Sequence, residues 1–169
     1  DWFAQIGAEP EARGLRQVFA AAPKARELIA GLCEYSPYLW DLVRADPDRI
    51  LRLLCGDPES QFQSLLAYNI GALTRIEGEA DAMRSLRRIK NETALLIGLA
   101  DIGGVWPVMQ VTRALTELAD NMVQAAVRFL LCDAVRRDRL RPADPEQPET
   151  GSGYIVLAMG KMGAFELNY

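Results

Sequence analysis

The chain has 169 residues, half of them hydrophobic, and a formal net charge of −4. This composition supplies a sizeable core for one medium domain, and the acidic balance argues against a nucleic-acid-binding surface, which needs a concentrated basic face. The sequence contains no histidine, which excludes a Ser-His-Asp triad, a Cys-His pair and any histidine ligand to a metal.

We expect a cytoplasmic protein that does not enter a membrane. The first residues lack the basic stretch and apolar core of a signal peptide, and apolar runs such as 94–100 are too short to span a bilayer. The three cysteines, Cys33, Cys55 and Cys132, are far apart and odd in number. Their spacing predicts neither a metal site nor a disulfide framework, so we expect buried, reduced thiols.

The first half of the chain predicts short helices joined by tight corners. Helical periodicity covers about residues 10–22 and 24–34, and Pro23 separates the two stretches. A capping side chain then precedes a proline three times, at Ser36-Pro37, Asp46-Pro47 and Asp57-Pro58. Serine or aspartate before proline is typical of a helix start. We expect the Tyr38-Leu39-Trp40 run after the first of these starts to pack inward.

The second half predicts longer helices over 59–77 and 79–102, a break at Gly103-Gly104, and a further helix that begins at Pro107 and continues to about Leu140. In this last helix apolar residues recur at alternating spacings of three and four, which is typical of a bundle seam. The opposite face is polar and includes Arg113, Glu117 and Arg128. The seam consists of Val108, Val111, Leu115, Leu118, Met122, Ala125, Phe129 and Cys132.

The end of the chain differs from the helices. Residues 141–152 are rich in proline and acidic side chains, which predicts an exposed connector without an apolar anchor. Residues 154–159 form a short apolar run that predicts a buried strand, Gly160 to Gly163 predict a tight corner, and 164–167 can begin a helix. Such an arrangement can present backbone N–H groups and a lysine to phosphate. The pattern alone is equally compatible with an ordinary glycine-rich turn.

Two common phosphate motifs do not fit this segment. A P-loop requires a glycine where Ile155 stands and a hydroxyl where Met162 stands. The dinucleotide fingerprint requires a third glycine where the sequence has Val156.

The run from Val156 to Tyr169 resembles the nucleotidyltransferase motif of the glutamine synthetase adenylyltransferase/adenylyl-removing enzyme family. Its Glu-Leu-Asn version, after a long helical stretch, resembles the N-terminal, adenylyl-removing region. In the family a serine pair and an Asp-x-Asp pair follow, at the point where this sequence ends. The Ser36 to Pro47 segment resembles the family more loosely, as do Arg87, Lys90, Asp101 and Gly104. The C-terminal residues that match in register are Gly160, Lys161, Gly163, Glu166, Leu167 and Asn168.

The resemblance implies a mainly α fold: a multi-helix bundle followed by the first strand and glycine corner of a nucleotidyltransferase (DNA polymerase β-like) α/β domain. We therefore expect a helical domain at residues 1–140, a linker at 141–152 and the incomplete start of the nucleotidyltransferase domain at 153–169.

The resemblance also implies a function. The family's N-terminal region removes AMP from a tyrosine of glutamine synthetase by Mg²⁺-dependent phosphorolysis, which yields ADP. Its other half adds AMP from ATP, and a PII-type nitrogen-signalling protein and glutamine control the balance. We expect the magnesium ligands beyond Tyr169 and no catalytic or metal-binding residue within the chain, so that the chain alone is inactive. The alternative is a helical regulatory or protein-interaction module without activity of its own.

By the same resemblance, nucleotide or phosphate binding falls to three residues of the corner. Gly160 would let a phosphate approach the backbone, Lys161 would supply positive charge, and Gly163 would permit the sharp turn. Glu166 and Asn168 would support the loop. Arg87 and Lys90 would form a basic wall near the nucleotide site or a partner's acidic patch, although a solvated basic face is the simpler interpretation of these two residues.

Overall fold

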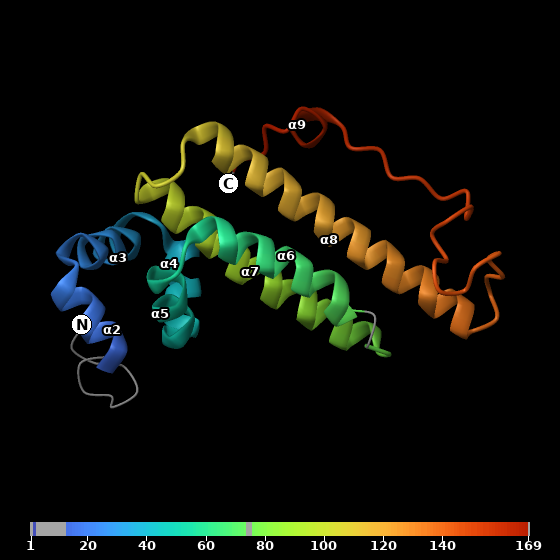
Figure 1. The fold of residues 1–169 in the computed structure, drawn as a ribbon, viewed down its shortest axis with the longest axis horizontal. Helices are drawn as coiled ribbons and strands as arrows, with labels where there is room; N and C mark the ends of the chain where they lie inside the picture. The colour runs from blue at the N-terminus through green and yellow to red at the C-terminus, as the bar shows by residue number, and fades with distance from the viewer. Residues whose placement is uncertain (1, 3–12, 74–75, 169) are drawn as a thin grey trace. The chain divides into compact units, whose positions relative to one another are not determined.

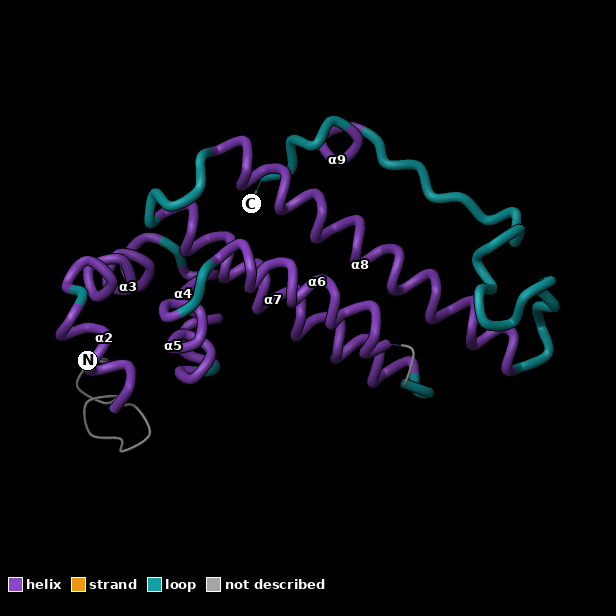
Figure 2. Tube along the Cα trace, in the orientation of Figure 1, coloured by secondary structure: helices purple, strands orange, loops and turns teal. Residues whose placement is uncertain are grey.

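The computed structural model describes residues 2, 13–73 and 76–168, and these form eight helices (Figures 1 and 2). Internal contacts divide the chain into unit 1, Asp1–Phe62 with Asn91–Pro107, and unit 2, Gln63–Lys90 with Val108–Tyr169. The helices α6 and α7 contribute residues to both units. The helices are α2 (Arg13–Ala21), α3 (Pro23–Tyr35), α4 (Pro37–Ala45), α5 (Pro47–Cys55), α6 (Pro58–Leu73), α7 (Glu79–Ile102), α8 (Val108–Arg136) and α9 (Gly160–Gly163).

The predicted proline starts are confirmed at α4, α5 and α6. The Asp46 carboxylate accepts a hydrogen bond from the Arg49 N–H at 3.0 Å, and the Asp57 carboxylate accepts one from the Ser60 N–H at 2.8 Å. Ser36 differs, because its side chain makes no capping hydrogen bond. It is the single residue between α3 and α4. Its backbone N–H donates to the Leu32 carbonyl at the end of α3, and its own carbonyl accepts from the Trp40 N–H at the start of α4.

In unit 1 the short helices α2 to α5 pack against one another. The substitution of any side chain for Gly14 on α2 would place a Cβ 2.7 Å from the Leu51 side chain, so α2 and α5 approach closely at this point. Phe62 and Trp106 meet edge to face with ring centroids 5.9 Å apart. The prediction that residues 38–40 point inward is correct for Leu39 and wrong for Tyr38. The buried apolar residues include Leu15, Ile29, Leu32, Leu39, Val43, Ile50, Phe62, Leu95, Leu96 and Ile97.

Unit 2 is built on the 29-residue helix α8. Its core contains Leu73 of α6, Ala82 of α7 and Ala125 and Phe129 of α8, which confirms these last two positions of the predicted seam. The first predicted position does not belong to the seam, because Val108 in the opening turn is 68% exposed. Buried positions on α8 are Val111, Ala114, Thr116, Leu118, Ala125 and Phe129.

The predicted strand is not present. Residues 154–159 are extended but have no ladder partner among the described residues, and side chains such as Ile155 and Leu157 are almost 80% exposed. A strand requires a neighbouring strand for its N–H and C=O groups, and the described part of the chain offers none. Helical structure also falls earlier than predicted, at Gly160–Gly163, while 164–168 form a turn and an irregular segment.

Two further expectations are corrected. The connector at 141–152 has an apolar anchor after all, because Pro148 is fully buried. The cysteines are not buried: Cys33 and Cys55 are exposed and Cys132 is partly exposed. All three lie near the C-terminal ends of their helices, α3, α5 and α8.

Candidate phosphate-binding corner

The corner after the extended segment depends on two glycines. Gly160 has a φ of +59°, a left-handed conformation that other residues adopt only with strain. A Cβ at Gly163 would lie 2.6 Å from the backbone oxygen of Ala158, so no side chain fits at that position. The chain then closes through the Glu166 N–H, which donates to the Lys161 carbonyl at 2.8 Å. The sequence placed the corner at 160–163 and a helix start at 164–167, whereas the structure has a short helix at Gly160–Gly163 and the turn directly after it.

Lys161 and Asn168 meet across this corner. The Lys161 ammonium donates to the Asn168 side-chain oxygen at 3.0 Å, and both residues are exposed. An ammonium group has three donors, so one bond to an amide leaves two donors that can reach a ligand. The Glu166 side chain is exposed. The geometry thus joins three of the predicted residues in one turn and holds the lysine head group over it.

A second contact connects the corner to α8. The Leu167 N–H lies 3.5 Å from the hydroxyl oxygen of Thr116, a residue that is only 2% exposed. The same hydroxyl donates to the Thr112 carbonyl one helical turn earlier at 2.9 Å. No sequence pattern points to Thr116, because the contact joins residues 51 positions apart.

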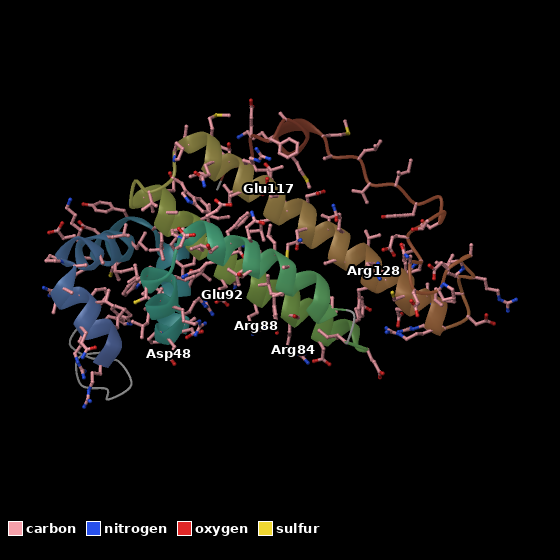
Figure 3. All side chains as sticks on the ribbon, viewed as in Figure 1. Asp48, Arg84, Arg88, Glu92, Glu117 and Arg128 are labelled. Atoms are coloured by element: carbon pink, nitrogen blue, oxygen red, sulfur yellow. The ribbon has the colours of Figure 1, made fainter. Side chains whose placement is uncertain are left out.

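The predicted basic wall does not meet the corner. Arg87 and Lys90 are exposed on α7. Residues 79–90 of α7 lie on the far side of α8 from α9, as Figure 1 shows. Figure 3 shows Arg84 and Arg88 of the same helix at the edge of the molecule remote from α9. Their partners are local: Arg84 pairs with Asp81, and Arg88 lies 3.4 Å from the Tyr68 hydroxyl.

The corner itself does not supply a magnesium site. Mg²⁺ prefers several oxygen ligands in octahedral geometry, and the turn from 160 to 168 offers one carboxylate, Glu166. Across the residues that the structure describes, no group of three or more Cys, Asp or Glu side chains is placed to hold a metal ion. None of the described helices is both long and apolar enough to cross a membrane.

Fold and site together define the class of this protein. It is a mainly helical domain that leads into a glycine corner, in which Asn168 holds the Lys161 ammonium. Residues 26–169 match the family model for glutamate-ammonia ligase adenylyltransferase. The chain therefore belongs to this family.

Comparison with curated proteins gives relatives of about half identity. The chain is 51% identical over 168 residues to the bifunctional glutamine synthetase adenylyltransferase/adenylyl-removing enzyme of Bradyrhizobium diazoefficiens. The aligned residues make up 99% of the chain and 17% of that enzyme. The proteins of the same name from Bradyrhizobium sp. (strain ORS 278) and Rhodopseudomonas palustris (strain HaA2) are 54% and 52% identical, over 100% of the chain and 17% of each enzyme. The chain thus spans about one sixth of these relatives. No solved structure matches it.

Proposed function

We propose that this chain is part of an enzyme that controls glutamine synthetase by removing AMP from a tyrosine of that protein. The observation that carries the proposal is the match of residues 26–169 to the family, together with the names of relatives that are about 50% identical. We assign the chain to the N-terminal, adenylyl-removing region, because the Glu166-Leu167-Asn168 sequence and the long helical lead-in resemble that region. The addition of AMP from ATP then falls to another part of the enzyme.

In this proposal the corner binds the attacking phosphate or the phosphates of the nucleotide. The absence of a side chain at Gly160 opens the backbone to a close ligand, and Gly163 permits the sharp turn. The Lys161 ammonium supplies positive charge from a position that Asn168 holds. Preorganised positive charge of this kind stabilises the charge that develops during phosphoryl and nucleotidyl transfer. Glu166 supports the turn through its backbone bond to Lys161.

Magnesium, when bound, would neutralise phosphate charge in an in-line displacement. We propose that its ligands lie outside the residues described, and we therefore expect the 169-residue chain alone to release no ADP from adenylylated glutamine synthetase and phosphate. Release of ADP by this chain alone would contradict that assignment. Glutamine synthetase is the partner that the relatives' names support, and a PII-type protein and a cytoplasmic location follow from the family resemblance.

A substitution at the corner tests the proposal in an enzyme of the relatives' length that carries this sequence. Lys161→Ala should lower phosphate-dependent ADP release at least about tenfold, because one preorganised charge is lost. Lys24→Ala is the matched control, since Lys24 is an exposed lysine of unit 1, on α3. Equal activity of Lys161→Ala and the wild type would reject the corner as the phosphate site.

The same assay decides between the two interpretations of the α7 cluster. The double substitution Arg87→Ala and Lys90→Ala should leave ADP release unchanged if these residues form a solvated face, which is what their position across α8 supports. A fall comparable to that of Lys161→Ala would assign them to the nucleotide site. If the helices act only as a regulatory module, none of these substitutions should change ADP release.

A further inference from the structure

The connector between α8 and the extended segment has a defined conformation. The Gln147 N–H donates to the Asp144 carbonyl and the Thr150 N–H to the Gln147 carbonyl, at 3.2 and 3.0 Å. The Glu146 N–H donates to the Asp144 carboxylate at 2.9 Å. Pro148, which belongs to this connector, is fully buried. Successive hydrogen-bonded turns around a buried ring are typical of an ordered element, whereas a flexible linker would leave these groups to water.

Arg128 of α8 holds this element from outside. Its Nη2 donates to the Glu146 carbonyl at 2.8 Å, and its Nη1 pairs with the Glu149 carboxylate. The Arg128 side chain is 31% exposed, and Figure 3 shows it on the second half of α8, where the connector turns back. A planar guanidinium that makes two bonds in one orientation fixes its partners more tightly than a single surface ion pair. We name Arg128, Glu146, Pro148 and Glu149 the clasp.

The ion pairs of the other two arginines of α8 stay within the helix. Arg113 pairs with Glu117, and Arg136 pairs with Asp133. Arg136 also makes one contact outside the helix, since its Nη2 lies 3.5 Å from the Glu77 carbonyl oxygen. The Arg128 contacts instead cross 18 and 21 residues of sequence. Pairs within a helix stabilise that helix by a few tenths of a kcal/mol. The Arg128 contacts determine where a different segment lies.

The segment that the clasp holds is the one that leads to the corner. Directly after it, Gly151 and Gly153 have φ values of +70° and +75°, and the Tyr154 N–H donates to the Ser152 hydroxyl oxygen at 3.1 Å. The chain then runs back along α8 to α9, as Figures 1 and 2 show. The point at which this segment leaves α8 is therefore set by the clasp.

We propose that Arg128 is a positioning residue for the corner. By holding Glu146 and Glu149, it fixes the start of the segment that carries Lys161, and so fixes the corner's place relative to α8. The consequence for catalysis rests on the proposed function. The structural part of the inference does not, because the order of the connector can be measured in the absence of any reaction.

The first experiment measures order. In an enzyme of full length that carries this sequence, amide hydrogen exchange is followed in peptides covering 142–153. Arg128→Ala should raise exchange there several-fold, because the connector loses two of its bonds to α8. Arg113→Ala, which removes an ion pair of the same helix without a contact to the connector, should leave exchange unchanged. Unchanged exchange in Arg128→Ala would overturn the clasp, whatever the activity does.

The second experiment measures function in the same variants. Arg128→Ala should lower kcat for phosphate-dependent ADP release about tenfold, since a small displacement of a reacting group has effects of this order. KM for adenylylated glutamine synthetase and the rate of AMP addition from ATP should stay within about twofold of the wild type. Arg128→Lys retains the charge and can satisfy one partner, so its kcat should lie between those of Arg128→Ala and the wild type.

Two results of this experiment would overturn the positioning role. One is a looser connector with an unchanged kcat. The other is a parallel fall in AMP removal, AMP addition and Tm, which would show general destabilisation. Failure of the proposed function gives a distinct result, in which Lys161→Ala retains full ADP release while Arg128→Ala still loosens the connector.

Discussion

At the scale of single residues, the turn at Gly56 after α5 shows how a glycine leaves room for a polar contact. A Cβ at Gly56 would lie 1.7 Å from the Gln61 amide nitrogen. That nitrogen donates to the Arg52 carbonyl at 2.8 Å and satisfies one of the open carbonyl groups in the last turn of α5. Glycine is thus required here for space, since its φ of −106° is open to any residue.

This geometry predicts a conditional cost of substitution. Gly56→Ala should lower the free energy of unfolding by about 0.5–1.5 kcal/mol, the usual contribution of one hydrogen bond, because the new Cβ displaces the Gln61 amide. In a Gln61→Ala background the same change should cost nothing. Urea titrations of the four proteins of this cycle provide the test. An identical cost in both backgrounds would mean that Gly56 is needed for another reason.

A second residue-scale prediction concerns acid. The Ser60 backbone N–H, and then its hydroxyl, hydrogen-bond to Asp57 and hold the pKa of this carboxyl below its usual value. A carboxyl with a lowered pKa stabilises the fold above its unfolded pKa, and the stabilisation is lost as pH falls through the folded value. Asp57→Ala should therefore lower Tm at pH 7 and lower it less at pH 3. Asp57→Asn, which retains an acceptor oxygen, should lie between. A difference in Tm that does not change with pH would contradict this account.

At the scale of helices, the face of α8 can be tested directly. Phe129 is 7% exposed, and the Arg136 guanidinium lies 5.8 Å from its ring centre. Phe129→Ala should lower the free energy of unfolding by about 3–5 kcal/mol, because it leaves a cavity in the core of unit 2. Val108→Ala and Arg113→Ala, at exposed positions, should cost less than about 0.5 kcal/mol. Similar losses of unfolding free energy at all three positions in urea titrations would show that a different face of α8 is buried.

The helices could be predicted because their signals are local. The Asp46 and Asp57 caps, the prolines that follow them and the apolar period of α8 each fall within a few residues of the structure they specify. Ser36 shows the limit of this reasoning. The same residue ends one helix and begins the next, and its backbone groups, which a sequence pattern does not show, make both connections.

The remaining features depend on distant partners. An apolar run such as 154–159 becomes a strand only when another strand lies beside it, so composition alone cannot decide its structure. The contacts of Arg128 and Thr116 likewise join residues 18 to 51 positions apart, and no period of a helix contains them. In the corner, the need for Gly160 and Gly163 was visible, whereas the bond between Lys161 and Asn168 required the structure.

At the scale of the whole chain, we expect the extended segment to govern self-association in solution, because its apolar side chains are uncovered. Tyr154, Ile155, Leu157 and Met159 are 61–81% exposed. Uncovered extended apolar segments promote association between copies. Deletion of residues 153–169 should leave the helical transition cooperative and reduce self-association, as measured by circular dichroism and sedimentation. Ile155→Ser with Leu157→Ser should reproduce the reduced association in the complete chain. Loss of the cooperative transition on deletion would show that the segment belongs to the helical core.

The placement of the aromatic residues has a practical consequence for such measurements. The three tryptophans of the chain, Trp2, Trp40 and Trp106, all belong to unit 1, where Trp2 and Trp40 lie edge to face with ring centroids 5.0 Å apart. Intrinsic emission excited at the indole band therefore originates in unit 1 alone. Unit 2, with the corner and the clasp, contributes no tryptophan fluorescence. Tyr154→Trp in a background without the three native tryptophans would therefore report on the segment that leads to the corner alone.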